Sequence, residues 1–329
     1  MFWNRLRNLP QEGKLKQQDN KVSESIISSI KIINVKSAVM RAKFEEKTYE
    51  NYFNSELAGK SSVYFPLGQV QEGSLGFDSS VMSRNRSLWK LLGYPFWFNP
   101  AFSGLPLREI ADEMESLLRS TLDKIPKIKA NLLFQYKKPA YITAANGSEW
   151  KHWKKPYYRY DIYKEQHNLL MHIDDVFGSK ILILYASPAL HDVDDLVDAY
   201  LNKKIISISN FRKVSELAQH HRNTYIKSGT FSIACSKPER IANFDLIELI
   251  ENLSLDSYKE YESNQSIIVN FREQLLAVVS QSPYYADSFS KLNNIYSEFA
   301  KYELLYSHLI LSNFRQITGL QWLAKVDQF

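Results

Sequence analysis

The sequence predicts an α/β fold with a mixed central sheet, followed by a helical C-terminal region. Two observations support this prediction. From residue 26 to about 235, strand-like apolar segments alternate with helix-like segments and are separated by proline or glycine. From residue 238 onward, apolar residues recur at helical spacing over 244–253, 267–279 and 289–311.

Length and composition allow one large domain or two of ordinary size. The chain has 329 residues, of which 44% are hydrophobic and 23% are charged, as is typical of folded proteins. The single cysteine, Cys235, excludes an internal disulfide or a cysteine-rich zinc site and favours a reducing compartment. The formal charge of +5 is compatible with a nucleic-acid partner but does not require one.

We expect a cytoplasmic protein with no membrane partner. No apolar run approaches the roughly 18 residues of a membrane span. The first residues lack the apolar core of a signal peptide. Phosphate-binding loops, dinucleotide fingerprints and nucleophile elbows are also missing from the sequence.

The first elements of the α/β part can be placed in order. An amphipathic helix is expected over 47–59, where a glycine ends it. A short strand follows at 63–65, and after a turn a second strand carries Asp78 at its end. An insertion over 84–128 then contains several aromatic residues.

The later elements form a strand, helix, strand succession. Within the insertion a helix is expected over 107–122, and a strand follows at 132–137. The pattern at 164–177 predicts a crossover helix. The apolar run 181–187 is typical of a strand that is buried on both faces.

Polar side chains end two of these strands. Asp78 closes one, and Gln135 and Lys137 close the other. Because side chains alternate along a strand, Gln135 and Lys137 share one face and Tyr136 points away. An acid, an amide oxygen and a lysine can hold a divalent ion and activate water. Taken singly, each residue also has a structural explanation: a turn cap, a sheet contact or a solvated strand end.

The order of elements, with these residues, resembles the αβββαβ core of the PD-(D/E)XK, or restriction endonuclease-like, nuclease superfamily. The resemblance covers about 44–190. Asp78 matches the aspartate of the second strand, and Gln135 and Lys137 match the third-strand motif in its glutamine, Mrr-like form. The family's helix glutamate corresponds to Glu50, with Glu46 as the substitute.

The resemblance implies an endonuclease that hydrolyses DNA with Mg²⁺, or with Mn²⁺ in its place. Asp78, Gln135 and Glu50 would bind the metal, and Lys137 would stabilise the reacting phosphate. Gln166 of the crossover helix would be an auxiliary polar residue. The resemblance also implies a role in restriction or anti-phage defence, together with a separate sensor or ATPase. Whether the substrate is DNA or RNA stays open.

Two alternatives stay open as well. The neutral Gln135 lowers the negative charge at the site, so the chain could be a catalytically silent nuclease-fold subunit that binds nucleic acid or scaffolds a defence complex. An interaction protein outside this fold is the third possibility.

Two further segments are candidates for contact with nucleic acid. Segment 151–160 interleaves cations with aromatic rings, as proteins that bind phosphates and bases do; an amphipathic strand would explain it equally well. Segment 220–225 starts with two histidines, but adjacent side chains rarely converge on one zinc ion. The candidate contacts are Lys151, Lys154, Lys155, Arg159, His221 and Arg222.

The expected organisation has three parts. Residues 1–25 form a polar lead-in, 26–237 the nuclease-like domain with the insertion 84–128, and 238–329 a helical region for assembly or regulation. Two cuts in a duplex usually need two active sites, so we expect a homodimer, with the C-terminal helices as its interface.

Overall fold

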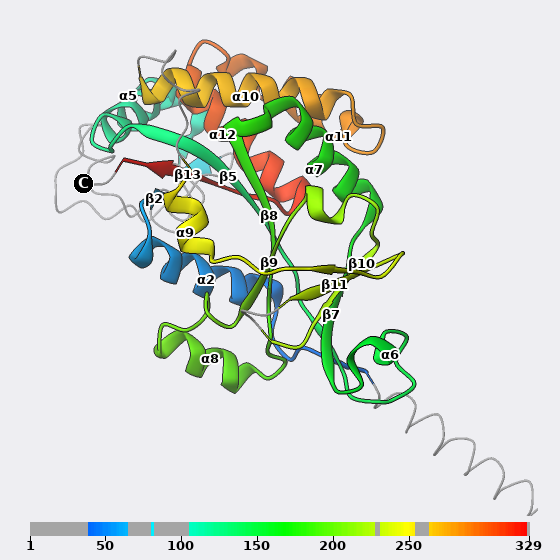
Figure 1. Ribbon diagram of the computed structural model, residues 1–329. Coiled ribbons are helices and arrows are strands. Elements are labelled where there is room, and N and C mark those ends of the chain that lie inside the picture. Colours follow the sequence, from blue (N-terminus) through cyan, green and yellow to red (C-terminus); the bar gives the residue numbers. More distant parts are fainter. Residues whose placement is uncertain (1–38, 65–79, 82–104, 228–230, 254–262, 328–329) are drawn as a thin grey trace, which may run out of the picture.

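The computed structural model describes residues 39–64, 80–81, 105–227, 231–253 and 263–327. Within them, a five-stranded mixed sheet has helices on both faces, and a six-stranded antiparallel sheet lies beside it (Figure 1). The expected α/β class with a mixed central sheet is confirmed. The lead-in 1–25, residues 84–104 of the insertion and Asp78 lie outside the described residues.

The mixed sheet has the order β2-β13-β5-β8-β9. Its central strands β5 and β8 run parallel, and every other pair is antiparallel. The segment between β5 and β8 contains the helix α7, which spans Lys164–Phe177 as predicted. The strand bounds are Val63–Tyr64 for β2, Gln321–Val326 for β13, Ile128–Tyr136 for β5, Ile181–Pro188 for β8 and Ser209–Lys213 for β9.

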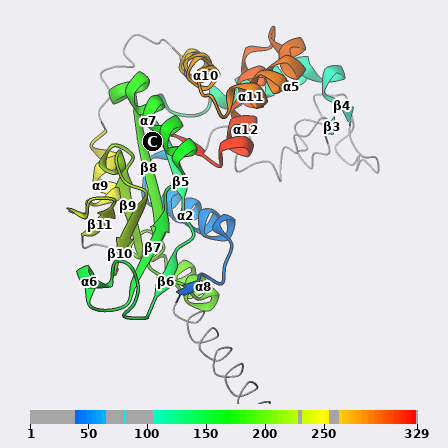
Figure 2. The same cartoon turned by 90° about the vertical axis from the view of Figure 1, so that its right-hand side faces the viewer.

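Alternating residues of the central strands build two cores, one on each face of this sheet. Leu133 of β5 and Ile183 of β8 join the core that includes α7 and the C-terminal helices. Leu132 and Leu184 point the other way, into a second core. The helices over the second face are α2 (Glu46–Lys60), α8 (Val193–Leu201) and α9 (Leu246–Glu251). The fold is therefore a three-layer α/β/α arrangement (Figure 2).

The C-terminal part supplies most of the helices over the first face. These are α10 (Asn264–Ser280), α11 (Ala286–Tyr296) and α12 (Glu303–Thr318), and α5 (Ala111–Leu122) packs against them. Short 3₁₀ turns lie at Leu107–Glu109, Gly178–Lys180, Ser215–Leu217 and Ser297–Phe299. None of the described helices is both long and apolar enough to cross a bilayer.

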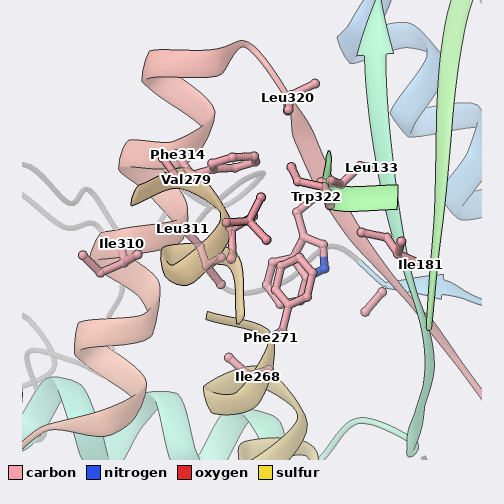
Figure 3. Packing of buried hydrophobic residues seen from close by; sticks show 14 of the residues in the cluster. Leu133, Ile181, Ile268, Phe271, Val279, Ile310, Leu311, Phe314, Leu320 and Trp322 are labelled. Carbon is pink, nitrogen blue, oxygen red and sulfur yellow. The ribbon is translucent and has the colours of Figure 1, made fainter. Parts of the chain in front are cut away.

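The C-terminal part also differs from the all-helical expectation, because it ends in a strand of the central sheet. β13 pairs antiparallel with β5 from Gln321 to Val326, and all six of its residues are buried. The indole nitrogen of Trp322 donates to Asn131 Oδ1 at 3.0 Å, and its ring stacks on Phe271 of α10 with centroids 4.9 Å apart. Figure 3 shows Trp322 between α10 and the sheet. The helices and the sheet thus share one core.

The strand predicted to carry Asp78 cannot be compared directly, because Asp78 lies outside the described residues. The residues just after Asp78 form β3 (Ser80–Val81), which pairs with β4 (Leu105–Pro106) in a separate two-stranded sheet. β13 is longer than β3 and is fully buried. It pairs with one edge of β5 from Ile128 to Phe134, so the backbone groups on that edge have hydrogen-bond partners.

The second sheet is antiparallel throughout, with the order β1-β6-β7-β10-β11-β12. The chain passes from β5 into β6 within a few residues, so the two sheets meet at the end of β5. Asn223 Nδ2 of β10 also donates to Asn210 Oδ1 of β9 at 3.0 Å. The strand bounds are Val39–Arg41, Ala140–Ile142, Tyr157–Asp161, Arg222–Tyr225, Ser232–Cys235 and Glu239–Ile241.

Candidate functional site

A cavity of about 510 Å³ opens where β5 leaves the mixed sheet and enters the second one. It lies between β1, the first turn of α2, the end of β5, β7, the start of α7 and the turn before β13. Elements from both sheets and from the two ends of the described chain therefore build it. Five of the residues that the sequence singled out line it: Glu46, Gln135, Lys137, Arg159 and Gln166.

Gln135 contributes a buried amide to this cavity. Its side chain is 2% exposed, and its Nε2 donates to the backbone oxygen of Tyr136 at 2.9 Å. Its Oε1 is buried and has no hydrogen-bond partner among the described residues. Tyr136 points to the other face of the sheet, where its ring packs edge-on to Tyr49. An unsatisfied buried amide oxygen costs free energy unless another group supplies a partner.

Lys137 is held by a fixed chain of hydrogen bonds. Its Nζ donates to Gln166 Oε1 at 3.0 Å, and Gln166 Nε2 donates to the backbone oxygen of Thr318 at 2.6 Å. The carbonyl of Thr318 can only accept, so it sets which end of the Gln166 amide faces the lysine. The crossover helix and the turn before β13 thus orient the ammonium together.

The backbone of Lys137 is fixed from the opposite side. Its N–H donates to Ala186 O at 2.9 Å, and its carbonyl accepts from Ser187 Oγ at 2.9 Å. Tyr225 donates in turn to Ser187 Oγ at 2.7 Å. The lysine therefore continues the ladder of β5 beyond its last strand residue.

The charge of Lys137 is perturbed by its surroundings. Burial lowers the pKa of Lys137 to about 8, although the carboxylates of Glu46 and Asp161 act in the opposite direction. Burial raises the pKa of Glu46, and Lys137 opposes this shift. A lysine and a carboxyl group with perturbed pKa values in one cavity are typical of functional sites.

The structure distinguishes the two candidate glutamates of α2. Glu46 lines the cavity, and its Oε2 accepts from the backbone N–H of Lys138 at 3.1 Å. Glu50 does not line the cavity. Its carboxylate instead pairs with Arg315 of α12 at 2.7 Å and with Lys47 at 3.0 Å. Glu46, the substitute in the sequence analysis, is the glutamate placed beside Gln135 and Lys137.

Most of the residues that were expected to contact nucleic acid do not line the cavity. Arg159 does, but Lys151, Lys154 and Lys155 lie in and just after the short helix α6 (Trp150–Trp153). His221 is exposed, and its Nδ1 is 2.8 Å from Ser236 Oγ. A role in binding nucleic acid stays a prediction for these residues.

Arg222 is held by two carboxylates. Its Nε donates to Asp161 Oδ1 at 2.6 Å and its guanidinium to Glu149 Oε1 at 2.8 Å. Burial acts to raise the pKa of Glu149, but hydrogen bonds from Ser148, Arg222 and Tyr157 outweigh it and lower the pKa to about 2. Arg222 would have to release one of these two carboxylates to bind a phosphate through the same nitrogen atoms.

The donors in the cavity fit part of a magnesium site. Mg²⁺ prefers oxygen ligands and retains several waters. Gln135 and Glu46 offer an amide oxygen and a carboxylate. Among the described residues no group of three or more His, Cys, Asp and Glu could hold a metal ion. Asp78, the predicted third ligand, lies outside the described residues.

The sequence analysis did not single out several residues that line the cavity, among them Arg41, Asp161 and Tyr163. Arg41 and Asp161 belong to strands of the second sheet, whose pairing leaves no local signal in the sequence. Tyr163 directly precedes the predicted helix 164–177, so its place at a helix N-terminus was visible. Comparisons of the chain with protein-family models, with curated proteins and with solved structures find no match.

Proposed function

We propose that this chain is a metal-dependent endonuclease that hydrolyses phosphodiester bonds in DNA, and that the cavity at the end of β5 is its active site. The observation that carries the proposal is the meeting of Gln135, Lys137 and Glu46 in one cavity. The buried, unpartnered oxygen of Gln135 and the lowered pKa of Lys137 add to it. The resemblance to PD-(D/E)XK nucleases supports the choice of reaction.

In this proposal, Gln135, Glu46 and Asp78 would hold the ion. A bound Mg²⁺ supplies an activated water and neutralises charge on the phosphoryl oxygens. Lys137 keeps its ammonium proton below its pKa of about 8 and faces the phosphate as a cation. Gln166 keeps that ammonium in place through its hydrogen bond. A preorganised cation in a buried site stabilises developing negative charge more strongly than one in water.

Plasmid cleavage tests the proposal. The purified protein is incubated with supercoiled DNA, and in parallel with single-stranded RNA, in Mg²⁺, Mn²⁺ or EDTA. The variants are Asp78→Ala and Lys137→Ala, and the matched control is Lys291→Ala, which removes a surface lysine of α11 whose side chain is 72% exposed. Circular dichroism establishes that each variant is folded.

We expect DNA cleavage that requires the metal, is abolished in both site variants and persists in Lys291→Ala. Cleavage that survives Asp78→Ala or Lys137→Ala would overturn the assigned site. Absence of cleavage together with salt-sensitive DNA binding would favour the silent nucleic-acid-binding subunit instead, because phosphate contacts release counterions. A role in restriction or anti-phage defence rests on the resemblance alone and needs a phage-challenge assay of the same variants.

A further inference from the structure

The rim of the cavity has an apolar part as well as its charged groups. The large hydrophobic side chains that are exposed in the described part of the chain include Tyr163, at 67%, and Val39, at 41%. Both of these line the cavity. Water-exposed apolar surface beside a polar cavity is typical of a binding site.

The backbone at Tyr163 is held by hydrogen bonds although the side chain is exposed. Tyr163 is the N-cap residue of α7, and its carbonyl accepts the first helical hydrogen bond, from His167 at 2.9 Å. The preceding residue, Ile162, is buried and donates to His221 O at 2.8 Å. A ligand that packs on this ring therefore does not have to order a loop.

The ring of Tyr163 also lies beside the ammonium group of Lys137. Lys137 Nζ lies 4.9 Å from its centroid, within the range of a cation–π contact. A flat group that stacks on Tyr163 is thus a neighbour of whatever anion Lys137 contacts. Arg41, Lys138 and Arg159 line the same cavity and add positive charge around it.

We propose that Tyr163 is a stacking platform for an unpaired nucleobase, adjacent to the phosphate that Lys137 contacts. This inference rests on the proposed function and adds the form of the substrate. Bases stack on aromatic side chains whatever their identity, because each base has a π face. A base inside a duplex already stacks on its neighbours, so it must leave the stack to reach the ring. The site therefore takes a single strand, or a duplex opened at that nucleotide.

The test separates stacking of bases from binding of phosphates. Two fluorescein-labelled strands of equal length are used, one of thymidines and one with abasic residues throughout, so that both carry the same number of phosphates. Fluorescence anisotropy in EDTA and low salt gives their dissociation constants. The variants are Tyr163→Phe, which keeps the aromatic ring, and Tyr163→Leu, which keeps apolar surface without a π face. Tyr284→Leu is the control, since Tyr284 is 66% exposed and does not line the cavity.

We expect Tyr163→Leu to weaken binding of the thymidine strand by roughly five-fold or more, the lower end for one stacked base. Binding of the abasic strand stays the same, and Tyr163→Phe and Tyr284→Leu match the wild type on both strands. If the wild type binds both strands and Tyr163→Leu changes neither affinity, the role of Tyr163 as a stacking platform is overturned. The proposed endonuclease function is unaffected by that result. If the wild type binds neither strand, the platform is overturned, and plasmid cleavage in Mg²⁺ decides separately whether the nuclease proposal stands.

Discussion

Gln135 and Lys137 owe their shared location to the two-residue repeat of a strand, and this was visible in the sequence. The crossover helix pattern also placed Gln166 on a polar flank near the strand ends. The choice between Glu46 and Glu50 was not visible. The two lie one turn apart on α2, and Glu50 pairs with the distant Arg315 as well as with Lys47, a long-range contact that the sequence does not reveal.

The two glutamates provide a matched pair of variants. We expect Glu46→Gln to lower metal-dependent cleavage by about ten-fold or more, since loss of a group that holds or orients a metal has an effect of that size. Glu50→Gln takes the negative charge away from Arg315, so it should cost about 1–3 kcal/mol of stability and leave the cleavage rate of the folded protein unchanged. Magnesium titrations of cleavage and urea unfolding of both variants measure the two effects. The opposite pattern would restore Glu50 as the ligand.

The lowered pKa of Lys137 predicts that the free energy of unfolding depends on pH. This prediction does not rely on the proposed activity. The folded protein releases the Lys137 proton near a pKa of about 8, whereas the unfolded chain keeps it to about 10.5. Between these values the unfolded chain binds more protons, so the free energy of unfolding rises with pH.

Relative to Lys137→Met, the wild type should gain about 2 kcal/mol between about pH 8 and about pH 9.5. Urea unfolding across this range, compared with the same series for the variant, isolates the lysine from the other titrating groups. A difference between the two proteins that is constant with pH would mean that the ammonium is not destabilised by burial.

Among the elements, α2, α7 and β8 followed from the sequence almost residue by residue. Each has a complete local signal: an amphipathic period with a clear end, or an apolar run between glycine and proline. β13 had no such signal. Gln321 and Lys325 make it look half solvated, yet Lys325 is buried and its Nζ donates to the carbonyls of Ile250 and Glu251 at the end of α9.

The role of β13 as a central strand leads to a stability prediction. Trp322→Ala removes a buried indole that stacks on Phe271, and we expect a loss of about 3–5 kcal/mol in the free energy of unfolding. Trp322→Phe keeps an aromatic ring there but loses the hydrogen bond to Asn131, so its loss should be smaller, about 1–3 kcal/mol. Urea denaturation followed by circular dichroism ranks the three proteins. Equal midpoints for all three would show that β13 does not belong to the cooperative core.

At the scale of the whole molecule, the fold class and the crossover helix between parallel strands were predictable, and the second sheet was not. Its strands are short, and two of its pairings, β1 with β6 and β7 with β10, join segments that are distant in sequence, so no local pattern identifies the whole sheet. The cavity forms where the two sheets meet, which is why the sequence indicated its strand-end residues but not Arg41 or Asp161 of the second sheet. The expected homodimer and the specific nuclease core stay predictions.

The pairing of β13 with β5 has a consequence for the order of events during synthesis. Asn131 and its partner Trp322 are 191 positions apart. While residues 321–326 are still inside the ribosome, the edge of β5 that they will cover has no strand, and Thr318 is not in place to orient Gln166. Pairing over such a distance is slow compared with local helix formation. The cavity therefore matures after translation has passed this strand, and nascent chains lack an assembled site.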